Sequence, residues 1–340
     1  MRAVVLRSPR EMSLTERPEP PPPGEGEALV RVLRVGVCGT DLHAFHGDQP
    51  MVSYPLVLGH ELAVEVLSVG PHVAGLEPGD VCAVVPYVDC GTCLACRAGR
   101  PNACLNLRVL GVHVDGGMSD LLTVPARLLL RAGDLPVDAV AMVEMLSVGE
   151  HAAARANLAH DDRVLVVGAG PIGLAATAAA RRRTPQVAVH DLDADRLAFV
   201  AAQRLARTVT AGAAGELRDA AAAALYGTPP NVVIDATGST ASMVAAASLL
   251  TPGGRLVLVG HTGGTLAFDN QTLHRLELTV LASRNATTID FAAVLGDLRA
   301  GTLDVEPWVT HRARLEDVPG AFAAWTARPP GLVKALVEVG

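Results

Sequence analysis

The stretch VLVVGAGPIG, residues 164–173, decides the fold class of this 340-residue chain. Its apolar start predicts a buried strand, and three glycines in G-x-G-x-x-G spacing follow before an alanine-rich segment that predicts a helix. The first glycine permits a tight turn, the second lets the backbone approach a pyrophosphate, and the third lets helix and strand pack closely. The N–H groups that open the helix also attract phosphates. The predicted dinucleotide-binding residues of this turn are Gly168, Gly170, Pro171, Ile172 and Gly173.

The next predicted strand, VAVHD, indicates which dinucleotide binds. It ends in Asp191, about 20 residues after the glycine turn, where a carboxylate accepts hydrogen bonds from both adenosine ribose hydroxyls. A carboxylate in that place repels a 2′-phosphate, so we predict NAD rather than NADP. Arg196 follows closely and is a further candidate for contact with the adenosine or a phosphate, although the start of a surface helix explains it equally well.

Strand and helix patterns alternate from about residue 163, which predicts right-handed βαβ units and a parallel sheet. The first 150 residues differ, because they show short β segments separated by proline and glycine. After about residue 286 the alternation weakens, and we expect this tail to fold back onto the first domain. The length of the chain suits two domains of roughly 100 to 200 residues each.

Charge and hydropathy exclude several classes of partner. The formal net charge is −7 and no long basic run occurs, so neither nucleic acid nor an anionic membrane is an expected partner. Arg181, Arg182 and Arg183 are expected to form the solvated end of a helix. The apolar residues 164–180 contain glycines and a proline and predict a strand, a turn and a helix rather than a membrane span. The N-terminal residues lack a signal-peptide pattern, so we expect a cytoplasmic protein.

Four of the six cysteines lie within fifteen residues, in the spacing C-x2-C-x2-C-x7-C. In a reducing compartment such clusters more often bind metal than form disulfides. The spacing suits four thiolates around zinc, and a ferredoxin-like cluster is the alternative, although its usual Cys-Pro pair is missing. Zinc with four thiolate ligands has no open position and stabilises a loop. The predicted structural ligands are Cys90, Cys93, Cys96 and Cys104.

Two further fragments carry metal-ligating and proton-transferring side chains. VGVCGTDLH, residues 35–43, contains Cys38, Thr40 and His43, and VLGHELAVEV, residues 57–66, contains His60 and Glu61. Each fragment alone is more often structural than functional.

Together, the motifs make the chain resemble the zinc-dependent alcohol dehydrogenases of the medium-chain dehydrogenase/reductase superfamily, in particular the sorbitol and polyol dehydrogenase branch. The matching motifs, in chain order, are GVCGTDLH, GHE, the four-cysteine lobe, EMLSVGEHA, GAGPIG and DATGS. The resemblance implies a GroES-like, partly open β-barrel catalytic domain with an inserted Rossmann domain, and an active site in the cleft. We expect residues 1–147 and 286–340 to form the catalytic domain and residues 148–285 the Rossmann domain.

The resemblance also implies a catalytic zinc held by Cys38, His60 and an acidic residue. Glu61 and Glu144 of EMLSVGEHA are the alternatives for that residue, and both are assigned to the metal shell. Met145 stands where the polyol branch usually has proline. With the structural site, the expected content is two zinc ions per chain.

Thr40, two residues beyond the Cys38 ligand, has a hydroxyl that can pass the substrate proton onward, and His43 can accept that proton because an imidazole ordinarily titrates near neutral pH. The implied function is an NAD- and zinc-dependent dehydrogenase acting on a secondary hydroxyl of a polyol, sugar alcohol or sugar acid. A simple alcohol or formaldehyde dehydrogenase and a non-catalytic NAD-binding regulator are the alternatives. The family implies a homodimer or homotetramer with a small-molecule substrate. His113 and Arg284 are pocket candidates whose roles stay open.

Overall fold

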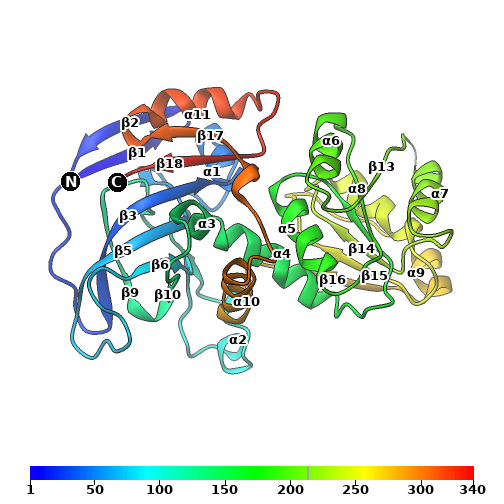
Figure 1. Cartoon of the computed structure of the whole chain (residues 1–340), viewed down its shortest axis with the longest axis horizontal. Helices are drawn as coiled ribbons and strands as arrows, with labels where there is room; N and C mark the ends of the chain where they lie inside the picture. Colours follow the sequence, from blue (N-terminus) through cyan, green and yellow to red (C-terminus); the bar gives the residue numbers. More distant parts are fainter. Residues whose placement is uncertain (213) are drawn as a thin grey trace. The chain divides into compact units, whose positions relative to one another are not determined.

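The computed structural model describes residues 1–212 and 214–340, and Figure 1 shows the order of their helices and strands. The chain divides into two compact units. The first unit contains Met1–Met145 and Thr287–Gly340, and the second contains Leu146–Ala286. The first unit is therefore built from two segments that are far apart in the sequence.

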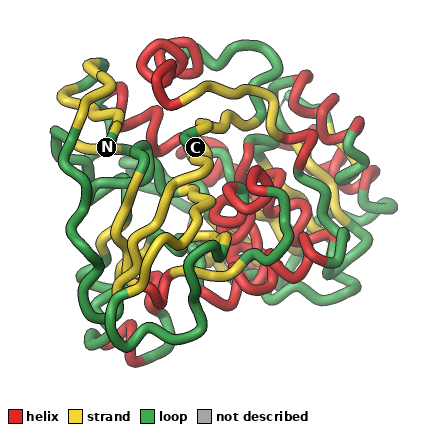
Figure 2. The backbone as a smooth tube through the Cα atoms, turned by 60° about the vertical axis from the view of Figure 1, so that its left-hand side comes forward, coloured by secondary structure: helices red, strands yellow, loops and turns green. Residues whose placement is uncertain are grey.

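The first unit is mainly β structure. Figure 2 shows its strands lying side by side. Its largest sheet has the order β10-β6-β5-β3-β18-β17, with β9 also pairing with β3, and smaller sheets have the orders β2-β1-β4 and β7-β8. The strands are β1 (Arg2–Ser8), β2 (Glu11–Glu16), β3 (Glu27–Val37), β4 (Leu56–Val57), β5 (Glu61–Val69), β6 (Val81–Val84), β7 (Tyr87–Val88), β8 (Arg108–Val109), β9 (Leu121–Pro125), β10 (Leu129–Arg131), β17 (Val309–Arg314) and β18 (Lys334–Glu338). Short strands lie throughout the first 150 residues, as the sequence predicted.

Short helices connect these strands. They are α1 (Gly39–His46), α2 (Leu94–Arg97), η1 (Pro101–Ala103), η2 (Ala126–Leu128), α3 (Val137–Ala141), α10 (Thr288–Arg299), η4 (Glu306–Trp308), η5 (Leu315–Asp317) and α11 (Val318–Thr326). Helix α4 (Val143–Arg155) begins in the first unit and continues into the second. The proline-rich residues 17–26 form no helix or strand, as their composition predicts.

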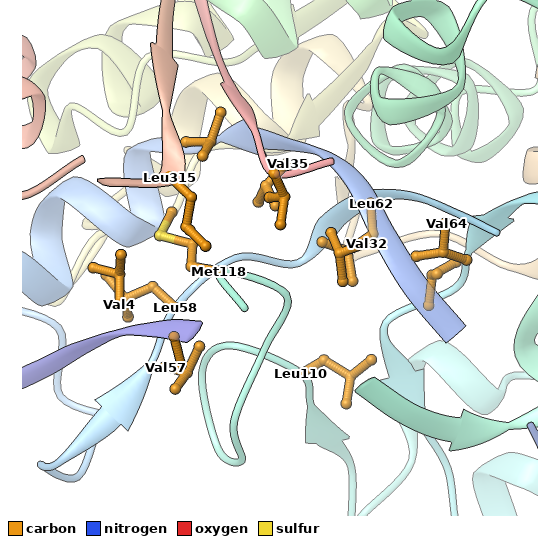
Figure 3. Close-up of a cluster of buried hydrophobic side chains, with 14 of the residues drawn as sticks. Val4, Val32, Val35, Val57, Leu58, Leu62, Val64, Leu110, Met118 and Leu315 are labelled. Carbon is orange, nitrogen blue, oxygen red and sulfur yellow. The ribbon is translucent and has the colours of Figure 1, made fainter. Parts of the chain in front are cut away.

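The core of the first unit lies against strand β3. Val30 and Val32 are fully buried, whereas Arg31 is exposed, which is the alternation of a strand with one face on a core. Val35 is also fully buried, because the register of β3 against β5 shifts between Val32 and Arg34. Figure 3 shows Val32 and Val35 among the other buried apolar side chains, including Leu62 of β5 and Leu315. Because the chain has few aromatic residues, this core is built mostly from aliphatic side chains, each contributing about 1.5–3 kcal/mol when fully buried.

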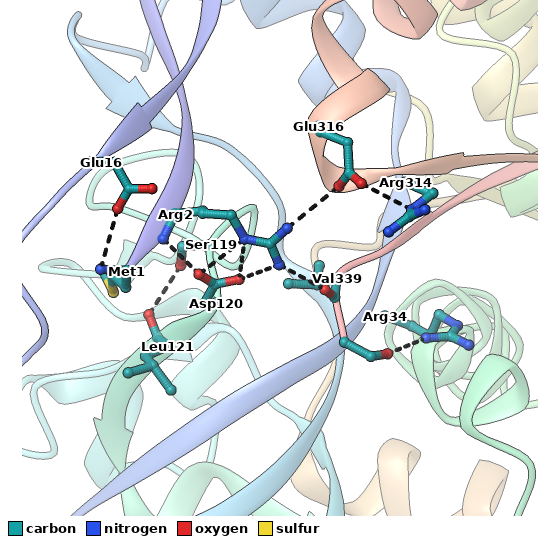
Figure 4. Close-up of polar contacts among 11 residues, drawn as sticks. Met1, Arg2, Glu16, Arg34, Ser119, Asp120, Leu121, Arg314, Glu316 and Val339 are labelled. Atoms are coloured by element: carbon teal, nitrogen blue, oxygen red, sulfur yellow. Dashed lines mark hydrogen bonds and ion pairs between the residues drawn. The ribbon is translucent and has the colours of Figure 1, made fainter.

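The C-terminal segment completes this sheet. Strand β18 pairs antiparallel with β3, with Leu336 opposite Gly36, and β17 pairs parallel with β18. The N-terminal strand is joined to the same region by Arg2, whose guanidinium bonds to Asp120 and to the carbonyl of Val339 (Figure 4). It also forms an ion pair with Glu316. The two ends of the chain are thus held within one folded unit.

The second unit contains a six-stranded parallel sheet in the order β13-β12-β11-β14-β15-β16. Numbered within the unit this is 3-2-1-4-5-6, the strand order of a Rossmann fold. The strands are β11 (Val164–Val167), β12 (Val187–His190), β13 (Arg207–Val209), β14 (Val232–Asp235), β15 (Arg255–Leu258) and β16 (Thr279–Ala282). The helices are α5 (Pro171–Arg181), α6 (Ala194–Ala202), α7 (Ala214–Ala224), α8 (Thr240–Ala245), η3 (Ala246–Leu249) and α9 (Asn270–Leu276).

The apolar stretch 164–180 forms strand β11, the glycine turn and most of helix α5, as predicted. All four residues of β11 are buried. No helix in the described ranges is long and apolar enough to cross a membrane. Arg181 ends helix α5, and Arg181 and Arg182 are exposed, as expected, but the sequence did not predict that Arg182 and Arg183 pair with the buried carboxylate of Glu150. A buried carboxylate needs such partners, and Glu150 lies far from them in sequence.

Candidate metal centres and cofactor site

The four-cysteine stretch folds into a compact sulfur cluster. Short helices α2 and η1 turn the chain so that the four Sγ atoms all lie within 4.8 Å of one another. The separations are 3.5 Å for Cys93–Cys96, 3.9 Å for Cys93–Cys104 and 3.4 Å for Cys90–Cys104. Sulfurs at about 2.3 Å from a tetrahedral zinc stand about 3.8 Å apart. The cluster therefore fits zinc, and its sulfurs are much too far apart for disulfides.

Backbone N–H groups favour the thiolate, which is the metal-binding form of cysteine, at two of the four positions, whereas burial raises the pKa of Cys96 to about 12. The N–H groups of Thr92 and Cys93 lower the pKa of Cys90 to about 5. The N–H groups of Cys96 and Leu105 lower the pKa of Cys93. Four sulfur donors fill a tetrahedral shell and leave no position for a substrate.

A second group of donors lies elsewhere in the first unit. The ligand atoms of Cys38, His60 and Glu61 all lie within 4.8 Å of one another. Cys38 caps the start of α1, and His60 and Glu61 stand where β5 begins. The Oε1 atom of Glu61 is buried and has no hydrogen-bond partner among the described residues. A buried carboxylate oxygen without a partner is costly, so the donor set fits a cation.

Asp41 orients this group and was missed by the sequence analysis. It is 1% exposed, and its carboxylate accepts hydrogen bonds from the N–H groups of Cys38 (2.9 Å) and Gly59 (3.3 Å). Its Oδ1 atom lies 3.5 Å from Nδ1 of His60. Burial alone would lower the pKa of His60, but the Asp41 carboxylate outweighs it and the pKa is raised. Carboxylates behind metal-ligating histidines commonly fix the imidazole orientation.

Glu61 is held from its other side by Lys334 of β18. Both side chains are almost fully buried and form an ion pair through Nζ and Oε2. Burial alone would lower the pKa of Lys334, but the charges of Glu61 and Cys38 outweigh it and the pKa is raised. A Cβ atom at Gly36 would lie 2.0 Å from Oε2 of Glu61, so glycine is required there.

Glu144 also lies in the first unit but has a different partner. Tyr87 of β7 donates a hydrogen bond from its hydroxyl to Oε1 of Glu144, and both residues are buried. Burial raises the pKa of Glu144, although the nearby His60 acts in the opposite direction. Burial and the carboxylate of Glu144 raise the pKa of Tyr87 well above its ordinary value. Glu144 does not belong to the group of mutually close donors that Glu61 shares with Cys38 and His60.

The predicted relay residues lie on α1. The Thr40 hydroxyl is 3.8 Å from Sγ of Cys38. His43 is half exposed, and its Nδ1 atom lies 3.0 Å from Oδ1 of Asp48. Thr40 is thus beside a candidate metal ligand, while His43 borders solvent.

The glycine turn of the second unit has the features of a phosphate-binding turn. Gly168 has φ +98°, and a Cβ atom at Gly173 would lie 1.7 Å from the Gly168 carbonyl oxygen, so larger residues are excluded. If Gly170 carried a Cβ atom, the nearest heavy atom beyond its chain neighbours would be a guanidinium nitrogen of Arg196, 3.8 Å away. The backbone at Gly170 is open to a ligand on that side.

Asp191 follows β12 beside this turn. Its carboxylate accepts hydrogen bonds from the N–H groups of Ala169 (2.6 Å) and Asp193 (2.9 Å). Arg196 lies within ion-pair distance of both acids, 3.6 Å from Asp191 and 3.6 Å from Asp193. Arg196 thus lies in the first turn of α6 and contacts Asp191 beside the glycine turn.

His113 and Arg284 are the two pocket candidates whose roles the sequence leaves open. Nδ1 of the exposed His113 accepts a hydrogen bond from the N–H of Val109 at 3.0 Å, so it fixes its own loop. Arg284 is exposed and precedes Asn285, which has φ +53°.

Comparisons with known families agree with this architecture. The family model for the alcohol dehydrogenase GroES-like domain matches residues 24–134, and the model for zinc-binding dehydrogenase matches residues 171–299. The chain belongs to the zinc-dependent alcohol dehydrogenase family and to its polyol dehydrogenase branch. The predicted fold class, a GroES-like barrel with a Rossmann domain, is confirmed.

Individual relatives match over nearly the whole chain. L-galactonate-5-dehydrogenase of Escherichia coli strain K12 is 41% identical over 312 residues, which are 92% of this chain and 91% of that protein. The crystal structure of the alcohol dehydrogenase RspB from Escherichia coli CFT073, complexed with NADH, is 29% identical with a TM-score of 0.90, covering 100% of this chain and 99% of that one. Galactitol-1-phosphate dehydrogenase from Escherichia coli is 26% identical with a TM-score of 0.90, and 100% of each chain is covered.

Proposed function

We propose that this protein is a zinc- and NAD-dependent dehydrogenase that oxidises a secondary hydroxyl of a polyol, sugar alcohol or sugar acid. The observation that carries the proposal is the second donor group, Cys38, His60 and Glu61. It has fewer donors than the four-cysteine cluster, so a metal there keeps a position for a substrate oxygen. Similarity to L-galactonate-5-dehydrogenase and galactitol-1-phosphate dehydrogenase supports a polyhydroxylated substrate.

The chemistry divides between the cofactors and the side chains. When bound, zinc lowers the pKa of the substrate hydroxyl, and NAD accepts the hydride from the same carbon. The hydroxyl proton has to leave toward solvent. Thr40 lies beside Cys38 and passes the proton on, and the half-exposed imidazole of His43 accepts it. The products are a ketone, NADH and a released proton.

The remaining assignments follow from this proposal. Residues 1–147 and 286–340 form the catalytic domain with both zinc sites, and residues 148–285 form the NAD-binding domain. Glu61 and Glu144 are both assigned to the catalytic metal shell as alternatives for its third protein ligand, directly or through water, and the structural zinc is held by Cys90, Cys93, Cys96 and Cys104. NAD is bound by Gly168, Gly170, Pro171, Ile172, Gly173, Asp191 and Arg196. The protein is a cytoplasmic homodimer or homotetramer.

A substrate screen tests the proposed activity. Purified protein loaded with zinc is mixed with NAD and with polyols, aldonates or short alcohols, and NADH absorbance is followed. We expect turnover with polyols or aldonates that exceeds turnover with short alcohols, and its loss after the metal is chelated. Preference for short alcohols would favour a simple alcohol dehydrogenase. If folded, zinc-loaded protein forms no NADH with any compound of the panel, the proposal is contradicted and a non-catalytic NAD-binding regulator is favoured.

Replacing Asp191 with alanine tests the cofactor assignment. The carboxylate stands beside the glycine turn, and its hydrogen bonds to ribose hydroxyls are worth about 1.5–3 kcal/mol, or roughly ten- to a hundredfold in affinity. We therefore expect Asp191→Ala to weaken NAD binding and to narrow the preference for NAD over NADP by about that factor. Titration of both cofactors by fluorescence measures the change. Equal binding of NAD and NADP by the unmodified protein would refute the role of Asp191.

A further inference from the structure

The two carboxylates assigned to the catalytic metal shell are anchored by partners of different chemistry. Lys334 is a cation and neutralises the carboxylate of Glu61. Tyr87 is a neutral donor, so it holds Glu144 in place without cancelling its charge. An ionised Glu144 in this buried environment therefore requires a nearby positive charge, which Tyr87 does not supply.

Only one oxygen of Glu144 is used by the protein. Tyr87 bonds to Oε1, and none of the residues that the structure describes donates a hydrogen bond to Oε2. Oε2 is thus available to a metal ion or to a water on that ion. One oxygen fixed by a hydrogen bond and the other left available is typical of a carboxylate whose orientation is set by an outer-shell donor.

The tyrosine itself is rigidly placed. Its ring contacts Phe291 edge to face, with centroids 6.3 Å apart and planes at 85°. Tyr87 also pairs with Val109 in the short β7-β8 ladder. The hydroxyl is therefore fixed by packing and by the backbone, rather than by Glu144 alone.

The buried groups of this region carry more negative than positive charge. Ionised Cys38, Asp41, Glu61 and Glu144 carry four negative charges, and Lys334 carries one positive charge. A divalent cation offsets two of the three negative charges that remain. Lys334 pairs with Glu61 and Asp41 lies beside His60, so a cation at this site acts mainly on Cys38 and Glu144.

Resting on the zinc-dependent function proposed above, we propose that Tyr87 is a positioning residue of the catalytic metal site. Its hydroxyl fixes Glu144 so that the free carboxylate oxygen serves the metal shell, while Lys334 restrains Glu61. Loss of the Tyr87 hydroxyl leaves Glu144 free to change orientation, which weakens the metal site without removing a ligand.

The variant Tyr87→Phe tests this role, because phenylalanine keeps the ring contact with Phe291 and removes only the hydroxyl. We expect the affinity of the Cys38 site for zinc, measured by competition with a chelator, to fall about ten- to a hundredfold. We also expect the visible absorption bands of cobalt substituted at that site to shift. Tyr54→Phe is the matched control, since the Tyr54 hydroxyl donates to the carbonyl of Ala44 at 2.6 Å in the same unit. It should leave zinc affinity and the cobalt spectrum unchanged.

Glu144→Gln and the double variant Tyr87→Phe/Glu144→Gln separate positioning from general destabilisation. If Tyr87 acts through Glu144, the double variant should bind zinc about as weakly as Glu144→Gln alone. Additive losses, or a Tyr87→Phe variant that matches the unmodified protein in affinity and spectrum, would overturn the proposal. A different result would contradict the proposed zinc-dependent function itself, namely that the unmodified protein binds zinc only in the four-cysteine cluster.

Discussion

Replacing Cys38 with serine is expected to remove catalytic turnover while leaving the fold and NAD binding intact. Cys38 is one of three mutually close donors of the second metal group and lies outside the four-cysteine cluster. A metal ion that polarises a substrate oxygen contributes several kcal/mol, so the turnover number should fall by about a thousandfold or more. The remaining zinc, surrounded by four thiolates, has no position for an alcohol. Zinc content should fall from about two ions per chain to about one.

The matched control for this variant is Cys82→Ser. Cys82 is the sixth cysteine, buried in β6 and outside both donor groups. Burial raises the pKa of Cys82 to about 12, and in the described part of the chain Cys82 belongs to no group of three or more metal-ligating side chains. Cys82→Ser should retain about two zinc ions and measurable turnover. Turnover that survives in Cys38→Ser with one zinc per chain would show that the second donor group is not the reaction centre.

Replacing Cys93 with serine should mainly reduce stability. Cys93 lies 3.5 Å and 3.9 Å from two other sulfurs of the cluster, and binding of structural zinc contributes directly to folding. Loss of one thiolate should release this zinc and loosen residues 90–104. We expect the melting temperature to fall by about 5 °C or more, since each kcal/mol lost shifts a domain of this size by about 2–4 °C. Zinc content and thermal unfolding measure the effect.

Activity distinguishes the two zinc sites in the Cys93→Ser variant. The fraction of the Cys93→Ser protein that stays folded should still turn over substrate. That turnover should still require the metal site that contains Cys38. The opposite pattern, a stable but inactive Cys93→Ser protein together with an active Cys38→Ser protein, would mean that the four-cysteine cluster performs the chemistry. That outcome would overturn the assignment of both metal sites.

Local sequence was sufficient for the features whose residues are close in the chain. The G-x-G-x-x-G turn predicted the βα unit, because its requirements for φ +98° at Gly168 and close contact at Gly173 act within ten residues. The spacing of Cys90, Cys93, Cys96 and Cys104 predicted one cluster, because short turns alone bring such sulfurs together. The fold class followed from alternating strand and helix patterns in the same way.

The tertiary structure decided how the second metal group is supported. Glu61 meets Lys334 only because β18, from the end of the chain, pairs with β3 beside β5. Tyr87 and Glu144 are 57 residues apart in the sequence, and nothing in either sequence neighbourhood predicts that their side chains form a hydrogen bond. Packing also brings Arg182 and Arg183 to the buried Glu150, a pairing that their sequence neighbours do not predict. Buried charges and hydroxyls are satisfied by whichever strand or helix packs nearby, and sheet pairing between distant segments determines that neighbour.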